Sequence, residues 1–180
     1  MILKKLLIMS MNNSGGDCVK IGIMADTHDN LKAAKEAVEF FNDRNVSYVL
    51  HAGDLISPFV VGKFSELDSE FHYVWGNNDG SRIHINSKLE EIGSDYGEEF
   101  KSLKIDGLEI ALLHGVEEAI VESLVKDSNF DLVVRGHTHE TEVREDPNLI
   151  NPGPTSGYLA GKKTLAIFDT EEMKGDIFEI

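Results

Sequence analysis

Short apolar runs alternate with helix-like segments through the first half of the chain, and this alternation limits the possible folds more than any other feature. The runs have the length of buried strands, and the segments between them carry apolar residues at helical spacing. In chain order they are "VKIGIMAD", "NLKAAKEAVEFFNDRN", "VSYVLHAGD", "SPFVVGKFSEL", "EFHYVWGNND" and "SRIHINSKLEEIG". Asn30 and Ser57 stand where the first two helices need N-caps, and Pro58 suits a first helical position.

The second half of the chain is richer in strands. The segment "EEFKSLKIDGLEIALLHG" predicts a hairpin that turns at Asp106 and Gly107, because Asp-Gly is a strong turn signal. A helix, "EEAIVESLVKDS", follows it, and then come a buried strand, "FDLVVRGHTH", and four short strands, "ETEVRED", "LINPG", "KTLAIFD" and "GDIFEI". A strand–helix–strand opening followed by further strands predicts one α/β domain in which helices cover mixed sheets.

Composition narrows the classes of partner and compartment. The 180 residues carry a formal net charge of -15, which argues against a broad nucleic-acid-binding face and against a long duplex as substrate. Cys18 is the only cysteine, so an internal disulfide is excluded and a reducing compartment is expected. No apolar run approaches the roughly 20 residues that cross a bilayer, and we expect no membrane association.

The first residues, "MILKKLLIMSMNNSGGD", differ in character from the rest. Lysines interrupt their apolar run and no convincing small-residue cleavage site follows, which disfavours a signal peptide. We therefore expect residues 1–18 to form a flexible extension, residues 19–180 to form a single domain, and the protein to be cytoplasmic.

Polar side chains stand at the ends of five predicted strands. Because residues at the carboxyl ends of strands in open α/β sheets meet in one crevice, we expect these side chains to lie together. Carboxylates, carboxamides and imidazoles without a thiolate suit divalent metals such as Mn, Fe, Ni, Co or Zn. The candidate ligands are Asp26, His28, Asp54, Asn77 or Asn78, His114, His137 and His139.

The spacing of these residues sharpens the prediction. Asp26 and His28 are two apart, as are His137 and His139, so each pair projects to one side if the chain stays extended. The set exceeds the four ligands of one tetrahedral ion but suits two ions that share a bridging carboxylate.

The remaining histidines have simpler interpretations. His51 lies inside a strand and is expected to be packed or hydrogen-bonded there, whereas His72 in an alternating strand is expected to face solvent. His84 follows "GNND", from where it either reaches a substrate or is an ordinary helix residue.

The ordered set "DTH … GD … GNND … HG … GHTH" resembles the calcineurin-like metallophosphoesterase superfamily, and within it the small phosphodiesterase group of bacteria and archaea. The resemblance covers roughly residues 19–180 and includes "NPG" at residues 151–153. It implies a four-layer α/β/β/α sandwich of two mixed sheets, with a two-metal site on one edge.

The resemblance also implies a role for each motif residue. One metal would be held by Asp26, His28 and His139, the other by Asn77, His114 and His137, and Asp54 would bridge the two. The implied ions are Mn first, with Ni, Fe, Co or Zn as alternatives.

The second asparagine of "GNND" departs from the family pattern. Many relatives have histidine at the position of Asn78, and asparagine is no general acid near neutral pH. We expect Asn78 to act in catalysis and substrate binding as a hydrogen-bond donor only, with a preference for good leaving groups. Asp79 is expected either to orient His28 or His114 or to cap the helix that starts at Ser81.

Two arginines are candidates for phosphate contacts. Arg82 is expected to bind substrate, and Arg135 either reaches the site or pairs with an acidic neighbour.

The function implied is hydrolysis of a small phosphodiester by a two-metal mechanism with a bridging hydroxide as nucleophile. A phosphomonoesterase or a nuclease would use the same site. A non-catalytic alternative is a protein-interaction scaffold, because a retromer subunit of eukaryotes shares the fold. The family often forms dimers or larger assemblies, so a homo-oligomer is possible.

Overall fold

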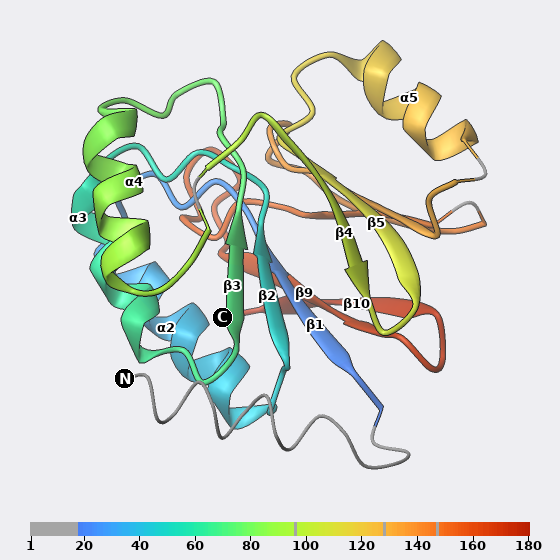
Figure 1. The fold of residues 1–180 in the computed structure, drawn as a ribbon, viewed down its shortest axis with the longest axis horizontal. Coiled ribbons are helices and arrows are strands. Elements are labelled where there is room, and N and C mark those ends of the chain that lie inside the picture. Colours follow the sequence, from blue (N-terminus) through green and yellow to red (C-terminus); the bar gives the residue numbers. More distant parts are fainter. Residues whose placement is uncertain (1–17, 96, 128, 147) are drawn as a thin grey trace.

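The structure is a computed structural model that describes residues 18–180 except 96, 128 and 147, and its strands form two five-stranded sheets (Figure 1). The first sheet has the order β10-β9-β1-β2-β3. Strands β1, β2 and β3 run parallel, while β9 lies antiparallel to both β1 and β10, so the sheet is mixed as expected. Its strands are β1 (Lys20–Met24), β2 (Tyr48–His51), β3 (Glu70–Tyr73), β9 (Thr164–Asp169) and β10 (Lys174–Glu179).

The second sheet has the order β4-β5-β6-β8-β7 and is also mixed. The predicted hairpin joins β4 to β5, and both of its turn residues have positive φ, 52° at Asp106 and 86° at Gly107. Asp-Gly tolerates that backbone better than other residue pairs. The strands are β4 (Phe100–Ile105), β5 (Leu108–Leu113), β6 (Leu132–Val134), β7 (Thr141–Glu145) and β8 (Asn148–Pro152).

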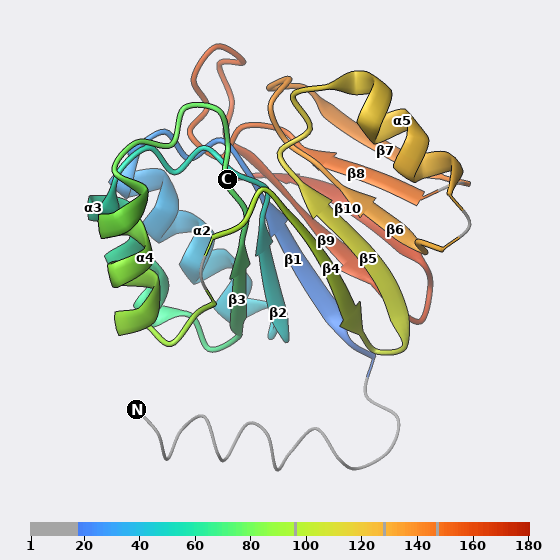
Figure 2. The ribbon, with the colours of Figure 1, turned by 45° about the horizontal axis from the view of Figure 1, so that its top comes forward.

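Helices cover the outer face of each sheet (Figures 1 and 2). Helices α2 (Leu31–Asp43), α3 (Pro58–Val61) and α4 (Arg82–Glu91) cover the first sheet, and α5 (Glu118–Lys126) covers the second. The predicted caps are confirmed, since the side chains of Asn30 and Ser57 accept hydrogen bonds from the backbone N–H groups of Ala33 and Phe59. The segment predicted as one helix after Ser57 becomes 3-10 in its second part, η1 (Gly62–Glu66).

The apolar side chains form three clusters that separate four layers. One cluster lies between α2, α4 and the first sheet and includes Phe41, Ile85 and Leu89. A second lies between the two sheets, and a third packs α5 on the outer face of the second sheet. The arrangement is the expected α/β/β/α sandwich. None of the described helices is long and apolar enough to span a bilayer.

One expectation about a strand is wrong. His72 on β3 is only 7% exposed: its Nδ1 lies 3.6 Å from Asp95, in the segment before β4, and its ring stacks on that of Tyr48. The edges of the two sheets meet there through the bridge between Val74 and Glu98, which a sequence pattern of one strand cannot predict. Burial lowers the pKa of His72.

Most of the predicted flexible extension, residues 1–18, lies outside the described residues. Its last residue, Cys18, is half-buried, and its thiol donates to Asp169 Oδ2 over 2.8 Å. Hydrogen bonding to Asp169 raises the pKa of this thiol.

Candidate metal centre

The predicted ligands come from both sheets and follow the carboxyl ends of parallel strands. Asp26, Asp54 and Asn77 follow β1, β2 and β3 of the first sheet, whereas His114 and the His137–His139 segment follow β5 and β6 of the second. The loops after β1, β2 and β3 lie at the upper edge in Figure 2. The two sheets therefore present their candidate ligands to one another across a shared edge.

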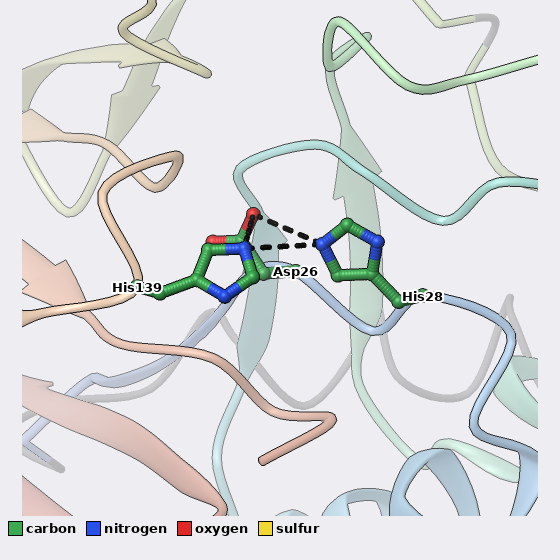
Figure 3. A group of neighbouring side chains, drawn as sticks. All are labelled: Asp26, His28 and His139. Atoms are coloured by element: carbon green, nitrogen blue, oxygen red, sulfur yellow. Dashed lines mark hydrogen bonds and ion pairs between the residues drawn. The ribbon is translucent and has the colours of Figure 1, made fainter. Parts of the chain in front are cut away.

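A first cluster consists of Asp26, His28 and His139 (Figure 3). The Nε2 atoms of the two imidazoles are 3.2 Å apart, and Asp26 Oδ1 lies 3.7 Å from that of His28 and 3.4 Å from that of His139. Asp26 Oδ1 is buried and makes no hydrogen bond to any described residue. A carboxylate oxygen left in this way is suited to a cation.

A second cluster consists of Asp26, Asp54 and His114, which are all buried. His114 Nε2 lies 3.5 Å from Asp54 Oδ2 and 3.0 Å from Asn77 Oδ1. Asp54 Oδ2 is also 3.6 Å from His28 Nε2, so this oxygen faces both clusters.

The tautomers of two histidines follow from their hydrogen bonds. His114 donates through Nδ1 to the carbonyl oxygen of Ala52 over 2.7 Å, and His139 donates through Nδ1 to that of Tyr158 over 3.1 Å. In the neutral ring each Nε2 then carries a lone pair and faces carboxylate or carboxamide oxygens, which are acceptors as well. Acceptors gathered without a proton between them fit a cation, and donation from the other ring nitrogen is typical of histidine ligands.

Local electrostatics differ between the two sides of the centre. The nearby carboxylate of Asp26 is the first cause of the raised pKa of His28, and burial opposes it. The pKa of His137 is lowered by burial first and by His114 second.

The backbone of the candidate ligands is strained. Five of them have positive φ, a region that L-residues seldom occupy and that concentrates at functional sites. The values are 53° at Asp26, 44° at His28, 62° at Asp54, 73° at His137 and 57° at His139.

The expectation from spacing holds for Asp26 and His28, which lie in one cluster, and fails for the other pair. Because these residues are not in strand conformation, His137 and His139 separate: His139 joins Asp26 and His28, while the ring of His137 lies 5.1 Å from that of His114. His137 belongs to neither of the two clusters.

Asp79 has a different role from either one predicted. Its carboxylate accepts from the backbone N–H groups of Asp54, Ile56 and Gly76, at 3.1, 2.7 and 2.6 Å, and from the hydroxyl of Tyr73. Among the described residues it is hydrogen-bonded to neither His28 nor His114, and the helix after Ser81 has no side-chain cap. Asp79 fixes the two loops that carry Asp54 and Asn77.

Asn78 lies directly on the candidate bridging residue. Its backbone N–H donates to Asp54 Oδ1 over 2.9 Å, and its side-chain amide donates to Asp54 Oδ2 over 2.7 Å. The amide that was expected to meet substrate is therefore engaged with Asp54.

The arginines and the other histidines lie around the centre. Arg82 pairs with Glu99, with its guanidinium 5.0 Å from the ring of Trp75, and Arg135 is buried and pairs with Glu118, the second of its predicted alternatives. His51 is fully buried as predicted, and its Nε2 lies 2.7 Å from Thr27 Oγ1. His84 is exposed, and its Nδ1 lies 2.7 Å from Ser81 Oγ.

Several groups that support the candidate ligands could not be recognised from the sequence. The carbonyls of Ala52 and Tyr158 belong to the backbone, which leaves no pattern in the sequence. The hydroxyl of Tyr73 belongs to a strand residue that is part of no recognisable motif. Gly76 did have a signal, as the glycine before Asn77: a Cβ there would lie 2.0 Å from Asp54 Oδ1.

The sequence profile of the calcineurin-like phosphoesterase superfamily domain matches residues 19–173. The chain belongs to this superfamily. The two mixed sheets and the Asp/His clusters described above agree with its membership of the calcineurin-like phosphoesterases.

Two proteins with similar sequences come from archaea. "Phosphodiesterase MJ0936" of Methanocaldococcus jannaschii is 41% identical over 86% of this chain and 95% of its own length. A "probable metallophosphoesterase" of Methanothermobacter thermautotrophicus is 30% identical over 87% of this chain and 90% of its own. The solved structure of an archaeal phosphodiesterase superposes with a TM-score of 0.85 at 39% identity, over 90% of this chain and all of that one.

Proposed function

We propose that this chain is a metal-dependent phosphodiesterase that hydrolyses a small phosphodiester. The observation that carries the proposal is the convergence of three imidazole Nε2 atoms, from His28, His114 and His139, on the carboxylates of Asp26 and Asp54. A relative named as a phosphodiesterase is 41% identical along nearly its whole length, which supports the same activity here.

The proposed centre holds two divalent cations. Asp26, His28 and His139 would bind one ion, and Asn77 and His114 would bind the other with His137 beside them. Asp54 would bridge the two ions, which is supported by the position of one of its oxygens between both clusters; Asp26 also takes part in both. Such ions supply Lewis acidity and a bound water of lowered pKa. Mn is our first choice, with Ni, Fe, Co or Zn as alternatives, because an oxygen- and nitrogen-rich site accepts all of them.

The chain's own residues hold this arrangement in place. Asn78 donates to both oxygens of Asp54, and Asp79 fixes the backbone of Asp54 and Gly76, so the bridging carboxylate is oriented before substrate arrives. A preorganised site avoids reorganisation during the reaction.

The test compares bis(p-nitrophenyl) phosphate with p-nitrophenyl phosphate, using metal-stripped protein reloaded with Mn or Ni. We expect metal-dependent turnover of the diester, with kcat/KM for the monoester lower by roughly tenfold or more, and loss of roughly a hundredfold or more in Asp54→Asn. Asp176→Asn is the charge-matched control, because Asp176 is exposed on β10. Protein that holds metal but hydrolyses neither ester would contradict the proposal and favour the scaffold alternative.

A second test addresses Asn78, because an amide cannot protonate a leaving alkoxide near neutral pH. We expect the wild-type rate to fall steeply as the leaving-group pKa rises across a series of aryl diesters. Asn78→His should flatten this dependence. An unchanged slope in the variant would show that position 78 takes no part in leaving-group departure.

A further inference from the structure

An apolar groove of about 540 Å³ opens beside the metal centre and shares two of its residues. We define this side groove by six of the residues that line it, Trp75, Asn77, Phe100, His114, Val116 and Ile120. Asn77 and His114 belong to the candidate ligands, whereas the others are apolar. Its volume lies in the range of sites that take small organic molecules.

The walls of the side groove come from separate parts of the chain. Trp75 follows β3, Phe100 begins β4, Val116 follows β5 and Ile120 lies on α5. Figure 2 shows α5 on the second sheet, with β3 and α4 on the other side of β4. The groove therefore lies along the junction of the two sheets, and it continues the edge from which the ligands project.

Exposure of the groove residues indicates a ligand. Phe100, Val116 and Ile120 are 39%, 48% and 55% exposed, although their side chains are large and apolar. Apolar side chains that surround one concavity next to reactive groups are typical of a binding site. Isolated exposed residues such as Ile83 on α4, which is 83% exposed, do not line it.

Charge restricts what the side groove accepts. Three charged residues, Glu99, Glu117 and Arg82, also line it, and the guanidinium of Arg82 is already paired with Glu99. A substituent with its own carboxylate or phosphate would meet these acids, whereas a neutral ring would meet Trp75 and Phe100. Aromatic rings favour such contacts with one another.

We propose that the side groove binds one substituent of the substrate, and that this substituent is an uncharged, apolar group of ring size. The inference rests on the proposed function, because the phosphoryl group must lie at the centre for its substituent to enter the groove. The substrate class is then a phosphodiester with one aryl-like or similarly apolar arm, and not one with a second charged group.

The test uses phenylphosphonate and methylphosphonate, which share an anionic head and differ only in the ring. Their dissociation constants are measured on metal-loaded protein by the fluorescence of Trp75, the only tryptophan in the chain, and by competition with diester hydrolysis. We expect phenylphosphonate to bind roughly tenfold or more tightly than methylphosphonate. Val116→Asn and Ile120→Asn should each lower that ratio at least about threefold.

Ile83→Asn is the matched control, since it changes an exposed isoleucine outside the groove and should leave the ratio as it is. Equal affinities for the two phosphonates, or a ratio that the groove variants do not change, would overturn the inference. The two proposals fail separately: diester hydrolysis without a ring preference leaves the phosphodiesterase standing. A ring preference without hydrolysis leaves an aryl-binding site and removes the phosphodiesterase.

Discussion

At the scale of single residues, Asp79 is the contact on which the geometry of the centre most depends. Its carboxylate accepts hydrogen bonds from three backbone N–H groups in two loops. The hydroxyl of Tyr73, which is fully buried on β3, also donates to it. Burial is the main cause of the raised pKa of Tyr73, and Asp79 adds to it. The tyrosine therefore stays a donor at all ordinary pH values.

The first prediction concerns this carboxylate. Asp79→Asn replaces an acceptor by a group that also carries donors, so the free energy of unfolding should fall by about 1.5–3 kcal/mol, the range for one hydrogen bond to a charged group. Tyr73→Phe removes one donor to the same carboxylate and should also cost about 1.5–3 kcal/mol. Chemical denaturation of both single variants and the double variant measures the coupling; strict additivity would contradict a shared network.

The second prediction concerns pH. His51 accepts from the Gly53 N–H at Nδ1, so its neutral ring donates to Thr27 from Nε2, and burial is the main cause that lowers its pKa to about 3. The unfolded state takes up this proton near its ordinary pKa and the folded state does not. The contribution of His51 to the free energy of unfolding is therefore fully present above about pH 6.5. It is lost as the pH falls towards 3, at about 1.4 kcal/mol per pH unit.

The measurement is the free energy of unfolding between pH 6.5 and 4.5 for wild type and His51→Asn. The variant should lose most of this part of the slope, while His84→Asn, at an exposed histidine, should keep it. Equal slopes for wild type and His51→Asn would mean that the buried ring is not held neutral.

At the scale of elements, the centre requires two loops to approach one another more closely than side chains allow. A Cβ at Gly76 would lie 2.0 Å from Asp54 Oδ1 and 2.4 Å from Asp54 N, and both atoms are fixed by other contacts. The backbone of the loop after β3 therefore packs directly against Asp54 in the loop after β2.

Gly76→Ala is predicted to displace Asp54, to lower stability by about 1–3 kcal/mol and to weaken metal binding at least tenfold. The control is Gly62→Ala, because nothing lies within 4 Å of a Cβ at Gly62 and its φ of -57° is helical. That change should be neutral or stabilise by about 0.4–1 kcal/mol. Metal titration monitored by calorimetry separates the two, and normal affinity in Gly76→Ala would contradict the close approach.

The elements themselves could be predicted because their signals are local. Periodicity, the caps at Asn30 and Ser57 and the Asp106-Gly107 turn each involve a few neighbouring residues. The burial of His72 could not be predicted from the sequence, since it depends on a segment that leads into the other sheet. The separation of His137 from His139 follows from left-handed backbone that the residue spacing does not encode, and only the family resemblance implied it.

At the scale of the whole molecule, the candidate ligands come from both sheets, so a bound cation would link the two sheets. Asp26 and Asp54 belong to the first sheet, and His114 and His139 to the second. An ion held between them binds only the folded chain, so it should stabilise the fold as a whole.

We predict that Mn or Ni at roughly 100 times its dissociation constant adds about 2.7 kcal/mol to the free energy of unfolding. For a domain of this length that raises Tm by about 5–10 °C. Thermal unfolding of stripped and loaded protein measures the shift, which Asp54→Asn should lose and Asp176→Asn should keep. An unshifted Tm in protein shown to hold metal would argue against binding between the sheets.

The pairing of β1 with β9 also has a consequence for the order of events during synthesis. Asp26 lies just after the end of β1. One of the two strands that pair with β1 is β9, which spans residues 164–169 and is synthesised after every other strand except β10. At about 5–20 residues per second, the nascent chain waits several seconds with that edge of β1 unpaired. An open edge of this kind invites pairing with other chains. Cation capture should therefore come late in biogenesis, as a step that follows closure of the first sheet.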